Sequence, residues 1–221
     1  MRPLVPATVL ALTLASCSSQ TGTVDDHPVS STPSKPPMSV AKAKTALLTL
    51  RDLPAGWTGG EPIGVTPEDV RPRRTYAPAE CLELFHPEYE LGRPSTAAQA
   101  TFDAEGDQRI FETVQSWPAQ QAALVQKVTD ALPRCATFTV TDPADIKTSF
   151  KVRQVPLAGL ADGVGLRAQI TGDGGGFVMY LVYVVRGGSV LHLHLNGDKL
   201  TEADVARTAR KATARLEAAR K

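Results

Sequence analysis

Residues 176–185 read GFVMYLVYVV, and this ten-residue run decides the class of fold that the chain can adopt. Almost every side chain in it is apolar, and its Val and Tyr residues favour extended strands. A strand that is apolar at successive positions must be covered on both of its faces. The run therefore predicts a central strand of a sheet.

The flanking residues extend this sheet in both directions. Arg186-Gly187-Gly188-Ser189 predicts a tight hairpin turn, after which VLHLHLN (190–196) pairs back onto the central strand. Before the central strand, GVGLRAQIT (163–171) alternates apolar and polar side chains, as a half-buried strand does. Similar alternation predicts further strands at 97–103, 109–117, 136–141 and 149–155.

Helical patterns surround these strands. We expect helices at 38–50 and 78–85, a helix opened by Pro118 that ends before Pro133, and a final helix from Thr201 with Asp204 in a capping box. The Pro-rich and charged stretch 59–79 predicts a long loop. The expected class is α+β: a single domain with a twisted antiparallel sheet and helices packed mainly on one face.

The amino terminus reads as an export signal. Arg2 precedes an apolar run from Leu4 to Leu14, which is too short to span a bilayer. Leu14-Ala15-Ser16-Cys17 matches the lipobox of bacterial lipoproteins, in which the cysteine receives a lipid and becomes the new amino terminus. We predict a signal peptide at 1–16 and a lipid anchor on Cys17 that holds the protein on the extracytoplasmic face of the cell membrane. An ordinary secretory signal is the alternative.

Composition separates a tether from the domain. Residues 17–37 are rich in Ser, Thr and Pro, which predicts a disordered tether, and one domain follows at 38–221. Without Arg2 the chain has 23 Lys and Arg against 23 Asp and Glu. A net charge of zero and only 5% aromatic residues argue against nucleic acid as a partner.

The two remaining cysteines predict a disulfide. Outside the reducing cytosol Cys81 and Cys135 can pair, and closing a loop of about 55 residues stabilises a fold by about 4 kcal/mol in the chain-entropy model. A metal-binding or nucleophilic pair is the alternative, although no CxxC spacing supports it.

Several of these features together resemble one known group. The lipobox, the tether, LLTLRDLPAGW (47–57), PAEC (78–81) and a second cysteine after the central helix are similar to actinobacterial sensor-domain lipoproteins. That group is similar to the PknH-like extracellular sensor domain of mycobacterial serine/threonine kinases. The resemblance implies an antiparallel sheet flanked by helices, with a cleft for a small ligand. The kinase domains carry two disulfides, whereas this chain can form one, between Cys81 and Cys135.

One further pair of side chains suggests chemistry. His192 and His194 alternate along a strand and so share a face, as two metal ligands do, with His86 or Asp198 as a third ligand. We interpret them instead as solvent-facing positions, with Leu191, Leu193 and Leu195 directed inward. The sequence predicts no metal and no cofactor.

Three functions remain open at this point. Because no nucleophile or metallohydrolase motif is present, we predict a non-catalytic envelope domain that binds a small molecule, a lipid or a protein partner. The first alternative is a carrier of lipid or another apolar molecule between membrane and wall. The second is an envelope hydrolase with an unrecognised site.

Overall fold

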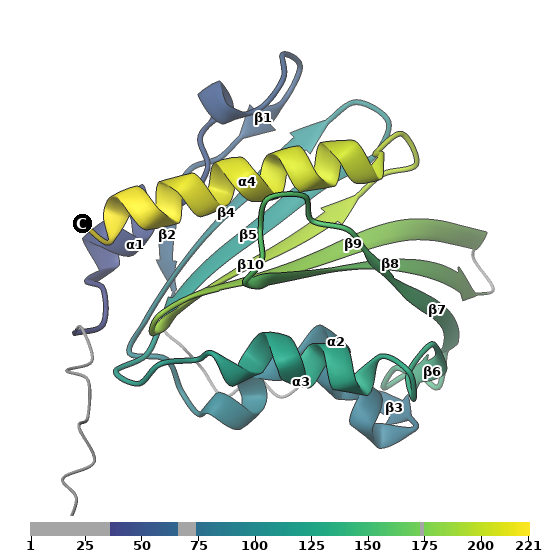
Figure 1. The fold of residues 1–221 in the computed structure, drawn as a ribbon. Coiled ribbons are helices and arrows are strands. Elements are labelled where there is room, and N and C mark those ends of the chain that lie inside the picture. Colours follow the sequence, from purple (N-terminus) through teal and green to yellow (C-terminus); the bar gives the residue numbers. More distant parts are fainter. Residues whose placement is uncertain (1–35, 66–73, 173–174) are drawn as a thin grey trace, which may run out of the picture. The chain divides into compact units, whose positions relative to one another are not determined.

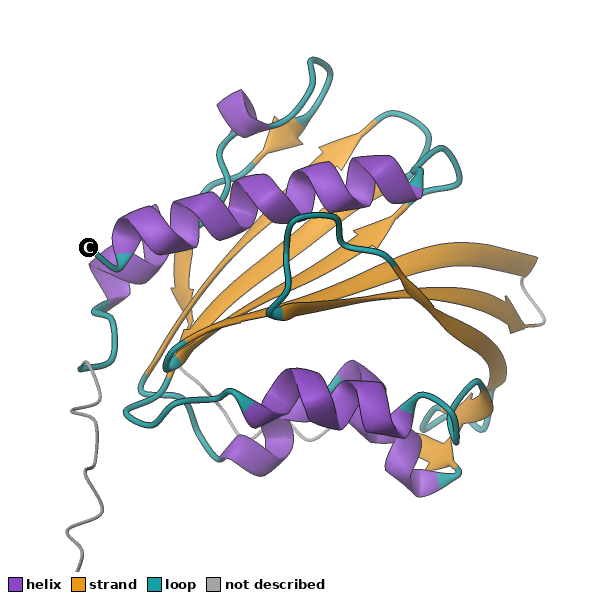
Figure 2. Cartoon of the chain, in the orientation of Figure 1, coloured by secondary structure: helices purple, strands orange, loops and turns teal. Residues whose placement is uncertain are grey.

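The computed structural model describes residues 36–65, 74–172 and 175–221 (Figures 1 and 2). Cys17, the signal peptide and almost all of the predicted tether lie outside these residues. None of the helices among the described residues is long and apolar enough to cross a membrane.

One antiparallel sheet contains all ten strands of the described residues. The strand order is β1-β4-β5-β10-β9-β8-β7-β6-β3, and β2 pairs with β4. The strands are β1 (Thr58–Gly59), β2 (Ile63–Val65), β3 (Thr75–Ala77), β4 (Thr96–Ala104), β5 (Gln108–Ser116), β6 (Thr137–Thr141), β7 (Lys147–Val155), β8 (Gly163–Gly172), β9 (Gly175–Arg186) and β10 (Ser189–Asn196).

The helices form a layer on each face of this sheet, as Figure 2 shows. They are α1 (Val40–Thr45), η1 (Leu50–Asp52), η2 (Ala79–Cys81), α2 (Leu82–Phe85), η3 (Pro87–Leu91), α3 (Ala123–Ala131) and α4 (Glu202–Ala219). α1 and α4 pack on one face, which we call the α4 face, whereas α2 and α3 pack on the other, the α3 face. The α+β class is confirmed, but the expectation of helices mainly on one face is wrong.

The central strand explains why both layers are needed. In β9 every residue from Met179 to Val185 is buried. Tyr180, Val182 and Val184 belong to the core under α4. Met179, Leu181, Tyr183 and Val185 belong to the core over α3. A single helical layer would leave one of these apolar sets in water, so the prediction of a strand covered on both faces is confirmed.

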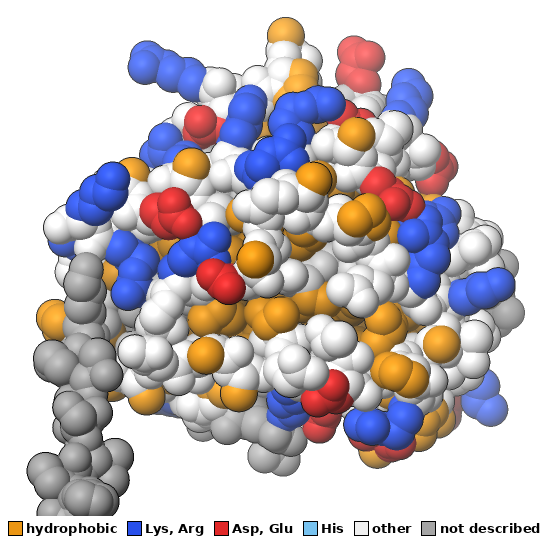
Figure 3. Space-filling model, viewed as in Figure 1, with side chains coloured by type: hydrophobic (Ala, Val, Ile, Leu, Met, Phe, Trp, Pro, Cys, Tyr) orange, Lys and Arg blue, Asp and Glu red, His pale blue; other side chains and the backbone are white. Residues whose placement is uncertain are grey.

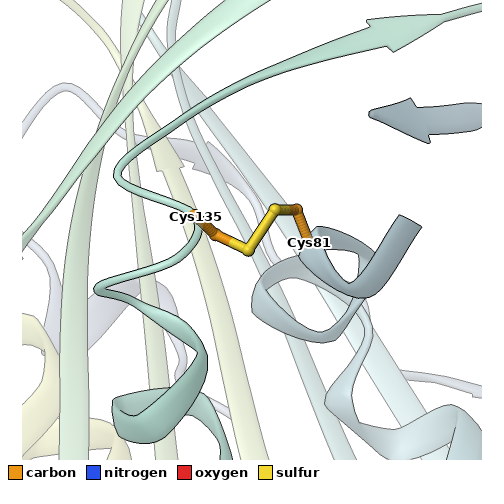
Figure 4. Close-up of a disulfide and its surroundings, with 2 residues drawn as sticks. All are labelled: Cys81 and Cys135. Carbon is orange, nitrogen blue, oxygen red and sulfur yellow. A yellow bond between two sulfur atoms is a disulfide. The ribbon is translucent and has the colours of Figure 1, made fainter. Parts of the chain in front are cut away.

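The disulfide joins two segments of the α3 layer. Cys81 at the end of η2 and Cys135 after α3 are bonded, with Cα atoms 5.4 Å apart and a separation of 54 positions in the sequence (Figure 4). Both side chains are fully buried. The bond therefore links the α2 segment to α3 on the face opposite α4.

Three local predictions are wrong, each for a tertiary reason. The first helix ends at Thr45 because the backbone N–H of Leu48 donates to Glu112 Oε2, 2.7 Å away, on the sheet. The helix predicted from Pro118 begins only at Ala123. The preceding backbone follows the β9–β10 turn instead, with Gln121 N donating to the Gly187 carbonyl.

The third wrong prediction is the long loop at 59–79. This segment contains β2 and β3, which are three residues each and exist through pairing with β4 and β6. Strands this short carry too few alternating positions to be recognised from sequence. The hairpin turn at Gly187-Gly188 and the capping box of Thr201 and Asp204 are confirmed.

Candidate ligand-binding cleft

A cleft of about 420 Å³ opens on the α4 face, and we call it the α4 cleft. Its walls are the loop Leu53–Trp57 after η1, the turn between β4 and β5, and the first half of α4 with the turn before it. The residues that give it chemical character are Trp57, Ile110, Leu200, Lys199, Arg207 and Lys211.

Apolar side chains line the interior of the α4 cleft. Leu53 and Ile110 are buried members of the core, and Trp57 and Leu200 are partly buried against it. No acceptor among the described residues binds the indole N–H of Trp57, so that donor is available to water or a ligand. An indole offers both a large apolar face and a single polar donor, which suits recognition of an amphipathic molecule.

Charged side chains of both signs form the rim. Asp204 accepts hydrogen bonds from Thr201 and forms an ion pair of 2.9 Å with Arg207, and these contacts, the Thr201 bond foremost, lower the pKa of its carboxyl. Lys211 donates to the backbone carbonyl of Asp52. Within the described part of the chain, Lys199 has no acid within ion-pair distance. Asp204 and Arg207 thus neutralise each other, and Lys211 is bound to a backbone carbonyl. Lys199 is the rim cation that remains available to an anionic group of a ligand.

Polar contacts hold in place residues 45–52, the segment that leads into the cleft loop Leu53–Trp57. Arg215 on α4 donates to the backbone carbonyls of Leu47 and Thr45, the latter at 3.0 Å, and lies 3.5 Å from Asp52. The segment is thus attached to α4 by Arg215 and to the sheet by the bond between Leu48 and Glu112. The cleft loop follows directly from it.

Glu112 is an unusual residue for this core. Its side chain is fully buried between Ile110 and Val114 on the α4 face, and Oε1 has no hydrogen-bond partner among the residues that the structure describes. Burial raises the pKa of its carboxyl from 4.5 to about 8, although the Leu48 N–H and nearby Arg215 act in the opposite direction. Glu112 is therefore protonated at neutral pH and acts as a structural hydrogen-bonding group. In the alternating pattern of β5, Glu112 occupies an inward-facing position between Ile110 and Val114. That polar residue at an apolar position was the sequence signal that could have identified it.

The histidine pair lies on the α3 face, beneath the helical layer. His192 is 8% exposed and stacks on Tyr183 with ring centroids 4.2 Å apart, and His194 lies 4.3 Å from it by the same measure. Burial, and then the neighbouring histidines, lower the pKa of both rings, that of His194 to about 4. The prediction of solvent-facing histidines is wrong, because β10 is a central strand and α2 covers this region through the bond from Tyr183 Oη to the Leu84 carbonyl.

A metal site at this pair is not supported. His86 lies close enough to affect the pKa of both rings, yet the described residues contain no group of three His, Cys, Asp or Glu placed to hold a metal ion. The structure brings Cys81 and Cys135 together as a disulfide rather than as a metal or nucleophilic pair. The resemblance implied a cleft, but sequence reasoning did not identify the residues of the α4 cleft, because its walls come from three separated segments.

These features define an extended antiparallel sheet with a helical layer on each face and a cleft beside the carboxy-terminal helix. The extracellular domain of PknH from Mycobacterium tuberculosis shares this fold, with a TM-score of 0.62 at 18% identity over 82% of this chain and 98% of that one. The resemblance predicted from sequence is confirmed at the level of the fold.

A second solved structure is also similar. It is a putative uncharacterized protein from Mycobacterium smegmatis, an Rv0999 ortholog, with a TM-score of 0.50 at 14% identity over 83% of this chain and 98% of that one. No family model matches the chain. No curated protein matches it either.

Proposed function

We propose that this protein is a non-catalytic, sensor-like domain, anchored outside the cytoplasm by lipid on Cys17, that binds a small amphipathic ligand in the α4 cleft. The observation that carries the proposal is the cleft itself: Trp57 and Leu200 within, and Lys199 on the rim without an acid partner among the described residues. A ligand with an apolar body and an anionic group complements this arrangement.

Three observations support the location. The lipobox ends at Cys17, the domain carries a disulfide, and the fold is shared with an extracellular domain. Disulfides persist in oxidising compartments, whereas the reducing cytosol opposes them.

The alternatives fit the cleft less well. A lipid carrier needs an interior able to enclose acyl chains, whereas the α4 cleft has a rim of charges of both signs. A hydrolase needs a nucleophile held by a base. Among the described residues, the carboxylates that bind hydroxyl groups are Asp52 and Asp204, and both do so as helix caps.

Native mass spectrometry of the protein extracted from its own envelope in mild detergent tests the proposal. We expect acyl mass on Cys17 and a discrete molecule that dissociates under gentle activation. In the Trp57→Ala variant that molecule should be missing, whereas the control Phe177→Ala, at an exposed site outside the cleft, should retain it. A protein that carries no molecule, or a molecule retained equally by both variants, would contradict binding in the α4 cleft.

A further inference from the structure

Helix α4 covers only part of its face of the sheet. Beyond it, the side chains of β6, β7 and β8 that point away from the α3 core are polar, and most of them are exposed. They line a shallow depression of about 610 Å³, and we call this surface the β6–β8 outer face. Its polar side chains are Thr137, Thr139, Ser149, Lys151, Gln169 and Thr171.

The strand register places these side chains in rows. Thr139, Ser149 and Thr171 lie opposite one another across three strands, and Thr137, Lys151 and Gln169 form the next row. Neighbouring strands are about 4.8 Å apart and same-face residues along a strand about 6.7 Å apart, so the rows form a regular lattice. None of these six side chains forms a hydrogen bond with another residue in the part of the chain that the structure describes.

Basic side chains extend the lattice toward α4. Lys147, Lys151 and Arg153 all point to this face from β7, and Arg167 lies directly opposite Arg153 on β8. Of these four, Arg153 forms an ion pair, with Glu202 at the start of α4. Lys147, Lys151 and Arg167 have no acid within ion-pair distance among the described residues. In the view of Figure 3, Lys and Arg side chains occur along the side of the molecule where Figure 1 shows β7 and β8.

This arrangement brings like charges close together on one face of the sheet. Like charges directly opposite each other on neighbouring strands repel, and Glu202 offsets the charge of Arg153 but not that of Arg167. A chain with a net charge near zero nonetheless places four cations on one sheet face, of which Arg153 alone has an acid partner among the described residues. An anion placed across β7 and β8 would relieve that repulsion.

We propose that the β6–β8 outer face binds an anionic envelope polymer, a polyol or glycan chain with repeated phosphate or carboxylate groups. Lys147, Lys151 and Arg167 would pair with the anionic groups, and the Thr, Ser and Gln side chains would hydrogen-bond the hydroxyls between them. The depression is shallow and lined mainly by polar side chains, which fits an extended polymer lying across strands. The apolar residues that also line the depression are Ala77, Phe138 and Phe150, and the two phenylalanine side chains pack in the core on the α3 face.

The test uses the full lipidated protein in detergent, with poly(glycerol phosphate) as the probe and neutral dextran as the comparison, by isothermal titration calorimetry at low and high salt. We expect binding of the polyphosphate chain alone, weakened by salt. The double variant Lys151→Gln/Arg167→Gln should lose affinity about tenfold or more, since each cation near an anionic surface contributes on the order of 1 kcal/mol. The matched control Lys42→Gln/Arg134→Gln removes the same charge from exposed sites elsewhere and should change affinity less than about twofold.

A variant without two of the hydroxyl groups distinguishes binding through hydrogen bonds from binding through charge attraction alone. Thr139→Val/Ser149→Ala keeps every cation and should still weaken binding at high salt, where charge attraction is screened. Equal losses in the test and control pairs would overturn the proposal, as would the absence of binding by the unmodified protein. Binding to phosphatidylglycerol vesicles without binding to the polymer would replace it with a membrane contact. Trp57→Ala should leave polymer binding intact, so failure of the ligand cleft and failure of this face remain distinguishable.

Discussion

Replacing Glu112 by Gln should make the protein more stable, and increasingly so as pH rises. In the unfolded chain the carboxyl titrates at its ordinary pKa of 4.5, whereas burial raises the folded value to about 8. Between these two values the folded state holds a proton that the unfolded state has released. Stability therefore decreases as pH rises through this window, and it is fully retained below pH 4.5.

The magnitude follows from the width of that window. Each pH unit within it costs about 1.4 kcal/mol, so the gain from Glu112→Gln should grow by about 3 kcal/mol between pH 5.5 and 7.5. Gln keeps the acceptor for the Leu48 N–H, and its neutral amide replaces the neutral carboxyl in nearly the same volume. The pH dependence of the difference isolates ionisation from any constant effect of packing.

Urea unfolding of both proteins at half-unit pH steps measures the effect, with the disulfide intact and far-UV circular dichroism as the readout. Glu83→Gln, at a partly exposed ion pair with Lys127, serves as the control and should show no such slope. A difference between Glu112→Gln and the unmodified protein that stays constant from pH 5.5 to 7.5 would refute the reasoning, because it would mean that Glu112 is ionised in the folded state.

Three further outcomes are expected. Replacing Cys81 and Cys135 together by Ala should lower the free energy of unfolding by about 4 kcal/mol, measured by urea titration against the oxidised protein. The pKa of His194 falls from 6.5 to about 4 on folding, so stability should be lost as pH drops through that range. His194→Gln should reduce this loss by about 3 kcal/mol between pH 6.5 and 4.5, measured by urea unfolding. A variant that loses as much stability over this range as the unmodified protein would contradict the expectation. Cys17→Ser should release the protein from the membrane fraction, which cell fractionation with immunoblotting detects; continued membrane association would argue against lipidation at that residue.

Much of the sheet was predictable because its signals are local. The apolar run of β9, the Gly-Gly turn and the alternation in β4, β5 and β8 depend on residues two to ten positions apart. The stripe of α4 was equally clear, with Val205, Ala209, Ala212 and Leu216 fully buried. The predictions failed where a distant backbone group replaced the local hydrogen bond, as at Leu48 and Gln121.

The histidines and the cleft were beyond sequence reasoning for a related reason. Alternation shows that His192 and Leu193 face opposite sides of the sheet, but it does not show that both sides are covered. The walls of the α4 cleft come from residues 52–57, 104–110 and 199–211. Only the folded chain brings these segments together.

By itself the sequence determined the antiparallel α+β class, the central strand, the carboxy-terminal helix and the two cysteines available for pairing. These follow from periodicity and composition, which act over a few neighbouring residues. Tertiary structure alone decided that helices cover both faces, that Glu112 is buried and protonated, and that the cations of β7 and β8 share one uncovered face. The physical reason is that burial and charge proximity depend on which distant segments pack together, and that is settled only when the two apolar faces of the sheet are covered.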